Sequence, residues 1–382
     1  MPNRIGHIDI AKGISIILVA LFHTGLTSYF PKIIGPMALF RLPLFFFLSG
    51  VFFKATMAPN AFFWKKFDAL LKPYFATLIL VFIVSALFGD KDYLWQLIGI
   101  LYGNGPVIKW VPMWFLPHLF TVYCFVYLIF RYTPFQNISP IVRYGILFTM
   151  LVVGIHFIDL IWNLNVNFFG VSKKLPGLPF SIDIILISSV FFIMGILTKE
   201  KVVSFRLNPY WLILSLSLFF LIASETDAYI DLNARYYNLP FIATIGAACG
   251  IYMIIAISFF IDKLPILFSI KKAFLVFGSS SLFILIFHRY IYSRTYEILC
   301  RLTDYEPSLI LTTLSFLAGI TIPLIIKILV SKSEVLSLFY FPLQGNTLFS
   351  RICSQFQTTP STPWAIENIL SPGKHPHNKT NH

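Results

Sequence analysis

Three ionisable residues lie inside the first apolar stretch of the chain, IDIAKGISIILVALFHTG: Asp9, Lys12 and His23. Charged side chains are costly within a bilayer, so those found there usually face protein or water and mark a functional site. Lys12 and His23 are about three helical turns apart, which places both side chains on one helix face with roughly 16 Å of rise between them. That face offers a cation near one membrane surface and, deeper in, an imidazole that can act as a general base.

Asp9 is too far away to orient this imidazole. Along one helix, the carboxylate lies roughly 21 Å from His23, far beyond hydrogen-bond reach. The expected partner of Asp9 is Lys12 at i+3, in an ion pair near the cytoplasmic face. A group that orients His23 must therefore come from a neighbouring helix.

The composition predicts the surroundings of this first helix. Of the 382 residues, 57% are hydrophobic and only 12% are charged, too little polar surface to cover a soluble globule of this size. We therefore predict an all-α polytopic membrane protein, a bundle of about ten transmembrane helices. The apolar runs of spanning length are 9–29, 38–56, 70–89, 113–131, 142–161, 180–198, 209–225, 238–261, 272–292 and 308–330.

The formal charge of +13 is distributed as a topology signal. Lysines and arginines fall mainly between the apolar runs and form no basic patch interleaved with aromatic residues, so no nucleic-acid partner is expected. With a cytoplasmic N-terminus, these cations collect on one side, and the positive-inside rule places both termini in the cytoplasm. Residues 1–332 then form a membrane domain, and the polar residues 333–382, rich in Pro, Thr, Asn and His, form a disordered cytoplasmic tail.

Other polar residues are expected near the depth of His23. His23 lies about 20 Å from the cytoplasmic edge of a core about 30 Å thick, and His288 reaches nearly the same depth. His118, Arg41 and Asp183 are expected on that level too, each from a different helix. Convergence of five helices on one level indicates a site in the outer half of the membrane.

Each of these residues also has a purely structural interpretation. His118 and His288 could serve only as hydrogen-bond partners between helices, which is equally common for a lone histidine. Arg41 could extend its charge to the outer interface. Asp183, close to a helix start, could simply favour the positive end of the helix dipole.

Three segments resemble the opening of the membrane acyltransferase-3 family: IDIAKGISIILVALFH, RLPLFFFLSGVFF and KKFDALLKPYF. The family pattern of Lys or Arg, ten residues, then His is met by Lys12 and His23, and its Phe-rich segment ends here in Ser49 and Gly50. The later MWFLPHLF resembles the branch of fucose O-acetylase-like proteins. The resemblance implies transfer of an acyl group from a donor, commonly acyl-CoA, to a sugar or another acceptor, and a place in the bacterial inner membrane.

The resemblance also implies roles for individual residues. His23 is the expected catalytic base, either in direct transfer or through a transient acyl-imidazole. The expected partners of the acyl-CoA phosphates are Lys12, Lys65, Lys66 and Lys72, and those expected to support catalysis or bind the acceptor are Asp9, Arg41, Ser49, Gly50, Trp114, His118, Asp183 and His288. The lysines could instead bind lipid headgroups, Ser49 and Gly50 could allow close helix packing, and Trp114 could be an interfacial anchor.

We therefore predict an integral-membrane O-acyltransferase, most simply an acetyltransferase using acetyl-CoA. Its acceptor would be a surface or extracytoplasmic glycan or lipid-linked saccharide, such as the O-antigen of lipopolysaccharide, and no metal is expected. The alternative is a transporter or flippase for a lipid-linked sugar, whose passage would be lined by the same polar groups. A third possibility is a structural or signalling subunit whose buried histidines only join helices.

Overall fold

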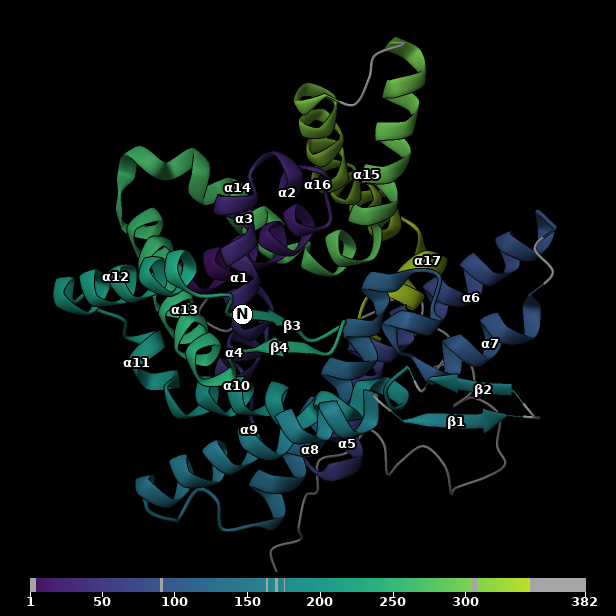
Figure 1. Ribbon diagram of the computed structural model, residues 1–382. Helices are drawn as coiled ribbons and strands as arrows, with labels where there is room; N and C mark the ends of the chain where they lie inside the picture. The colour runs from purple at the N-terminus through teal and green to yellow at the C-terminus, as the bar shows by residue number, and fades with distance from the viewer. Residues whose placement is uncertain are drawn as a thin grey trace, which may run out of the picture.

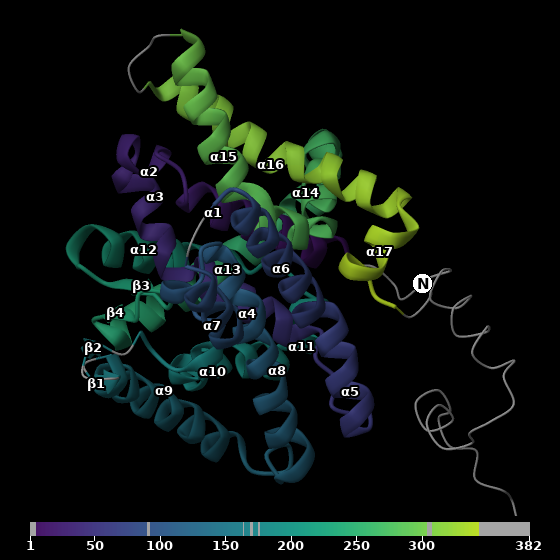
Figure 2. The same ribbon diagram turned by 90° about the vertical axis from the view of Figure 1, so that its right-hand side faces the viewer.

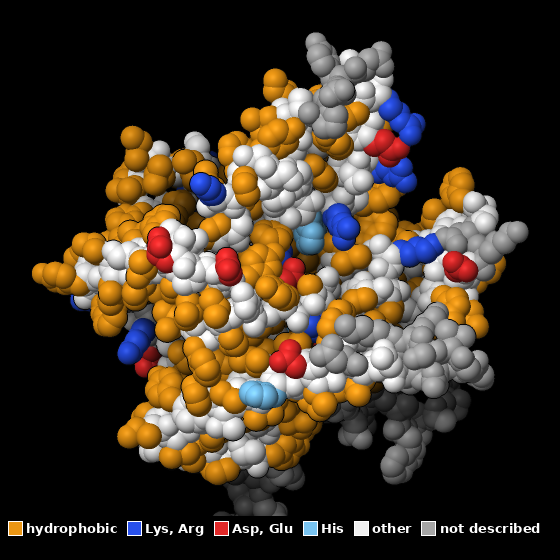
Figure 3. All heavy atoms as spheres, in the orientation of Figure 1, with side chains coloured by type: hydrophobic (Ala, Val, Ile, Leu, Met, Phe, Trp, Pro, Cys, Tyr) orange, Lys and Arg blue, Asp and Glu red, His pale blue; other side chains and the backbone are white. Residues whose placement is uncertain are grey.

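The computed structural model describes residues 5–89, 92–162, 164–168, 171–174, 176–303 and 308–343, and these are almost entirely helical (Figure 1). Within them, seven helices are long and apolar enough to cross a membrane, or eight if one bent pair counts as a single span, where the sequence predicts ten. Helices α1 (Gly6–Phe22) and α12 (Pro209–Glu225) have 17 residues each. The chain is thus a multi-helix membrane protein, and hydrophobic side chains cover most of the face seen in Figure 3.

The remaining helices follow the expected apolar runs and the loops between them. In chain order they are α2 (Leu26–Tyr29), α3 (Pro31–Ile34), α4 (Ala38–Val51), α5 (Pro59–Lys66), α6 (Lys72–Leu87), α7 (Tyr93–Tyr102), α8 (Phe115–Tyr132), α9 (Pro140–Trp162), α10 (Ile185–Leu197), α11 (Lys199–Val203), α13 (Pro240–Lys263), α14 (Phe268–Ser279), α15 (Ser281–Thr303), α16 (Leu309–Lys332) and α17 (Glu334–Tyr340).

Helices α1 and α4 form the centre of the molecule, as both ribbon views show (Figures 1 and 2). Helix α1 packs against α4, α13, α14 and α15, while α4 packs against α10 and α13. Close approach depends on glycine: Gly50 of α4 lies against the carbonyl of Phe192, and Gly195 of α10 lies against that of Phe47. Such small residues let the backbones of membrane helices meet.

Gly50→Ala is expected to destabilise the protein by about 1–3 kcal/mol, because the added methyl group would collide with the Phe192 carbonyl oxygen in a packed core. The matched control is Gly145→Ala on α9, where nothing lies within 4 Å of the new methyl group. That control should leave stability unchanged or raise it by up to about 1 kcal/mol. Thermal unfolding in detergent compares the two variants, and equal unfolding temperatures would contradict the packing role of Gly50.

Two expected spans differ from the structure. The run 9–29 is not one helix, because α1 ends at Phe22 and the Thr24 hydroxyl bonds the Leu21 carbonyl and the Leu26 amide, which redirects the chain into α2. The run 272–292 is divided into α14 and α15, which meet at an angle of 88°. The break falls in Gly278-Ser279-Ser280-Ser281, a sequence of the kind that allows sharp kinks.

The start of the expected tail is part of the described fold. After Lys332, α17 folds back beside the end of α16 (Figure 2). The Tyr340 hydroxyl bonds Thr77 of α6, and the Phe341 carbonyl accepts a hydrogen bond from Lys72. Residues 344–382, the rest of the expected disordered tail, lie outside the described residues.

Two antiparallel hairpins complete the fold. Strand β1 (Asn165–Phe168) pairs with β2 (Val171–Lys174) after α9. Strand β3 (Tyr229–Asp231) pairs with β4 (Tyr236–Asn238) between α12 and α13. The second hairpin crosses the molecule beside α4 (Figure 1), and it brings polar side chains into the interior.

Candidate active site

A cavity of about 50 Å³ lies where α1, α4, α8, α15 and the β3–β4 hairpin meet. A water molecule needs roughly 10–15 Å³ of such space, so the cavity holds several waters or a small chemical group. Its wall is mixed, with polar and aromatic groups among aliphatic ones: Val19, His23, Arg41, Leu42, Phe45, Pro112, Trp114, Phe115, Asp231, Asn233 and Leu285. Three of the residues predicted from sequence, His23, Arg41 and Trp114, therefore share one cavity.

His23 stands at the cavity because it ends α1. Its amide still bonds the Ala20 carbonyl, so His23 directly follows the last turn of the helix that carries Lys12. Immediately beyond, the Gly25 amide donates to the hydroxyl of Tyr292 on α15. That bond holds the end of α1 against the helix that carries His288.

His288 is the nearest described aromatic neighbour of His23. The two ring centroids are 5.3 Å apart with an interplanar angle of 39°. His288 is 2% exposed, and its Nδ1 lies 2.7 Å from the Ile284 carbonyl oxygen. The described ring beside His23 thus comes from a neighbouring helix, α15, which is where the sequence places any group that orients His23.

Arg41 is buried in the cavity wall and does not extend to an interface. Its side chain is 4% exposed, stacks over Phe22 at 3.6 Å and forms an ion pair with Asp231 at 3.5 Å. Its Nε finds no hydrogen-bond partner among the described residues. One buried guanidinium N–H therefore has no acceptor among the described residues.

The β3–β4 hairpin supplies the opposite part of the wall. One oxygen of Asp231 accepts hydrogen bonds from the amides of Asn233 and Ala234, and the other faces Arg41. The Oδ1 atom of Asn233 has no partner among the described residues. Burial, followed by the charge of Asp231, raises the pKa of Tyr229 in the same hairpin, so its phenol stays neutral.

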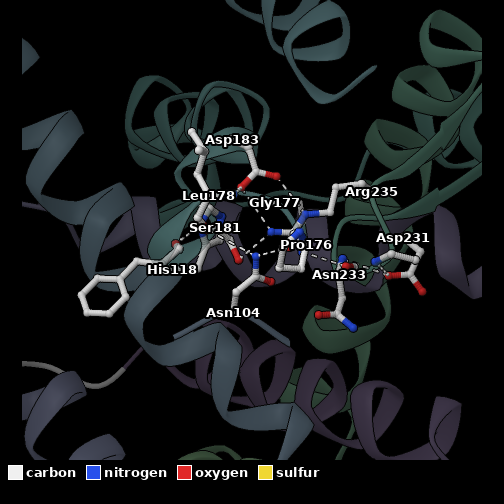
Figure 4. Close-up of polar contacts among 12 residues, drawn as sticks. Asn104, His118, Pro176, Gly177, Leu178, Ser181, Asp183, Asp231, Asn233 and Arg235 are labelled. Atoms are coloured by element: carbon white, nitrogen blue, oxygen red, sulfur yellow. Dashed lines mark hydrogen bonds and ion pairs between the residues drawn. The ribbon is translucent and has the colours of Figure 1, made fainter. Parts of the chain in front are cut away.

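A buried ion pair anchors this hairpin (Figure 4). Arg235 donates to Asp183 at 2.8 and 3.2 Å, and the two side chains are 0% and 1% exposed. Arg235 also donates to the Ser181 hydroxyl and the Asn233 carbonyl, and Asp183 accepts from the Leu178 amide. Asp183 therefore does more than favour a helix dipole, because it fixes the hairpin that carries Asp231 and Asn233.

His118 lies beside the segment that carries Asp183 but does not line the cavity. Its Nε2 lies 2.8 Å from the Ser188 hydroxyl of α10, and its Nδ1 lies 3.3 Å from the Phe180 carbonyl. Trp114, which does line the cavity, stacks on the His118 ring with centroids 5.6 Å apart. His118 is thus the interhelical hydrogen-bond partner that the sequence allowed, and it supports a wall residue.

Ser49 and Gly50 lie away from the cavity. The Ser49 hydroxyl donates to the Phe45 carbonyl in its own helix at 2.9 Å, and Gly50 is in the contact with α10. The structure thus places both in the packing role that the sequence left open. Arg41 is the described donor on α4 that lines the cavity.

The four expected phosphate-binding lysines have different surroundings. The ion pair between Lys12 and Asp9 is confirmed at 3.2 Å, and the Lys12 ammonium also lies over Phe52 at 3.8 Å. Lys66 stands over the Tyr123 ring at 3.4 Å, and Lys65 approaches the sulfur of Met57 at 4.0 Å. Lys72 pairs with Asp68 beside a π-helical turn, Phe67–Leu71, that precedes Pro73.

The sequence does not identify Asp231, Asn233 or Arg235 as site residues. The available signal is YIDLNARYYN, in which two short aromatic runs flank Asn-Ala-Arg, a pattern typical of a hairpin. The pattern does not reveal what the turn contacts. Only the fold shows that this turn lines the same cavity as His23.

Fold and site together define a polytopic membrane protein with a small cavity of mixed polarity, whose wall contains one histidine and one arginine. A family comparison makes the assignment: the sequence profile described as "Acyltransferase domain", that of the acyltransferase-3 family, matches residues 5–331, and the chain belongs to this family. It is thus a membrane acyltransferase by family. No curated protein and no solved structure matches the chain significantly.

Proposed function

We propose that this protein transfers an acetyl group from acetyl-CoA to a hydroxyl of an extracytoplasmic or surface polysaccharide sugar, such as an O-antigen sugar. The observation that carries the proposal is the position of His23 in the wall of a cavity that also contains Arg41, Asp231 and Asn233. A general base must reach the hydroxyl whose proton it removes. The cavity provides space for an acceptor hydroxyl beside the His23 ring.

The proposed topology uses the two 17-residue helices as further crossings. A helix of this length is at the short end of what spans a bilayer. With α1 and α12 added to the seven spans and the bent pair, the chain would cross ten times, and both termini would lie in the cytoplasm of a bacterial inner membrane. Lys12 then lies toward the cytoplasmic donor, and His23 toward the external acceptor.

The proposed reaction is direct transfer. A neutral His23 imidazole takes the proton of the acceptor hydroxyl while the oxygen attacks the thioester carbonyl carbon. The tetrahedral species then breaks its carbon–sulfur bond, and the thiolate of coenzyme A takes the proton back from His23. The free N–H of Arg41 is the proposed donor to the oxyanion, since a preorganised donor there is worth several kcal/mol.

The hairpin forms the proposed acceptor side of the cavity. Asp231 and Asn233 offer oxygen acceptors for sugar hydroxyls, and Asn233 Oδ1 has no described partner to give up. Trp114 offers an apolar ring surface in the same wall. Such a mixture of an aromatic surface and a few polar groups is typical of small-ligand sites.

The four lysines are the proposed partners of the donor phosphates. Lys12 is the best placed, because it is on the helix that leads to His23 and about a third of its side chain is exposed. Lys72 would have to exchange its present contacts with Asp68 and the Phe341 carbonyl. The set can supply point charges, although not the bidentate contacts that arginine makes.

Reconstituted protein tests the proposal. Proteoliposomes given acetyl-CoA and a polysaccharide lacking acetyl esters should yield an acetylated glycan, detected by mass spectrometry. Acetyl-pantetheine, which lacks the nucleotide phosphates, should be a donor with a much higher KM. Movement of a lipid-linked sugar without any covalent product would favour the transporter.

A further inference from the structure

The second imidazole, His288, has a tautomer that its own helix determines. Nδ1 lies 2.7 Å from the Ile284 carbonyl oxygen and 3.1 Å from that of Leu285. A carbonyl oxygen only accepts hydrogen bonds, so Nδ1 must carry the proton. In a neutral imidazole the lone pair is then on Nε2.

This Nε2 atom is buried and has no hydrogen-bond partner among the described residues. Burying an acceptor without a partner costs roughly 1–3 kcal/mol, so such an atom calls for an explanation. The nearest described ring that can supply an N–H is His23, with its centroid 5.3 Å away. Either ring nitrogen of a neutral His23 can carry a proton.

The protein holds His288 firmly in this position. The Trp110 indole donates to the Ile286 carbonyl on one side of it, and Tyr292 accepts from the Gly25 amide on the other. Gly319 of α16 lets that helix approach the His288 carbonyl. The 88° bend after α14 directs α15 to this point, so His288 is fixed relative to the end of α1.

We propose that His288 is a positioning residue for His23. Its Nε2 accepts a hydrogen bond from a water molecule that in turn accepts one from a ring N–H of His23, and this bridge leaves the other His23 nitrogen unprotonated and facing the cavity. This inference rests on the proposed function for its catalytic consequence. The pairing itself also predicts which nitrogen of His288 carries a proton, and this prediction does not depend on substrate.

Two substitutions separate positioning from packing. His288→Gln keeps a polar acceptor near the position of Nε2, whereas His288→Phe keeps the ring volume and removes the acceptor. For a positioning role, Phe should lower kcat at least about tenfold with little change in the KM of acetyl-CoA, and Gln should restore part of the loss. For a role in packing alone, Phe should be the better replacement, because Phe287 and Trp110 already make this region aromatic.

A double variant tests whether the effect passes through His23. If His288 acts only on His23, then adding His288→Phe to His23→Ala should cause no further loss of the residual transfer. An additional loss, or full activity of His288→Phe alone, would overturn the inference. Failure of His23→Ala to lower transfer would instead reject the proposed catalytic base.

A measurement on the wild-type protein does not depend on activity or on the folding of variants. Nitrogen NMR of protein labelled at histidine distinguishes protonated from unprotonated ring nitrogens, and the signals are assigned by comparison with His156→Ala, His23→Ala and His288→Gln. We expect His288 to show a protonated Nδ1 and an unprotonated Nε2 that accepts a hydrogen bond. A protonated Nε2 on His288 would disprove the pairing.

Discussion

Replacing His23 by alanine is expected to lower acyl transfer by about 10²–10⁴-fold, the usual contribution of a positioned general base. Because His23 lines the cavity, we expect its loss to slow the transfer step and not to unfold the protein. Apart from His23, Asp231 is the lining residue that could act as a base, and its carboxylate is paired with Arg41. Without the imidazole, the cavity wall therefore has no unpaired base to take the hydroxyl proton. The rate of acetyl transfer by purified protein at saturating acetyl-CoA measures the loss.

The fold should survive this substitution. The His23 ring makes no hydrogen bond to the described residues, and the bond from its backbone N–H to the Ala20 carbonyl does not need the side chain. His156→Ala on the exposed face of α9 is the matched control, because it removes the same side chain at a site far from the cavity lining and should keep both activity and stability. Normal transfer by purified His23→Ala protein would refute the assignment of the base.

The residues that sequence predicts well are those whose role depends on position along one helix. Helical spacing alone relates Asp9, Lys12 and His23, and the apolar runs predict a similar depth for His23 and His288. The ion pair between Asp9 and Lys12 follows from this spacing. The contact between His23 and His288 agrees with their expected similar depth, but depth alone does not predict it. A membrane restricts how helices are oriented, so the position of a residue in an apolar run predicts its depth.

The residues that sequence predicts poorly are those whose role depends on how loops fold back. The Asp183–Arg235 pair joins residues far apart in the chain through a hairpin, and no periodicity indicates that the hairpin enters the interior. The sequence also does not predict the bend at Ser280, because the segments on both sides of it are apolar and together have the length of one span. Local composition signals a possible break there but not its angle.

Neutralising one partner of the Asp183–Arg235 pair is the second substitution with a large expected effect. Asp183→Asn leaves an arginine that is 0% exposed without its counter-charge, which typically costs about 3–5 kcal/mol. The amide also replaces a carboxylate that accepts from the Leu178 backbone. Unfolding of the purified protein in mixed micelles with increasing denaturing detergent measures the free energy of unfolding.

An exposed ion pair provides the comparison. Glu297 pairs with Arg294 and Arg301 on the surface, and Glu297→Gln should change stability by at most about 1 kcal/mol, since water screens such pairs. A double variant, Asp183→Asn with Arg235→Gln, should recover part of the loss because it leaves no unpaired buried charge. Equal effects of Asp183→Asn and Glu297→Gln would show that the buried pair does not stabilise the fold.

The two large effects should differ in kind, and the geometry explains why. In the proposed reaction His23 is the base that lines the cavity, and its ring makes no hydrogen bond to the described residues, so its loss should remove activity at nearly constant stability. Asp183 reaches the cavity only through Arg235 and the hairpin that carries Asp231 and Asn233, so its loss should lower stability first and activity in proportion to the folded fraction. If Asp183→Asn protein were as stable as wild type but inactive, the hairpin would have to contribute to chemistry directly, and Asp231 rather than Arg41 would become the first residue to test.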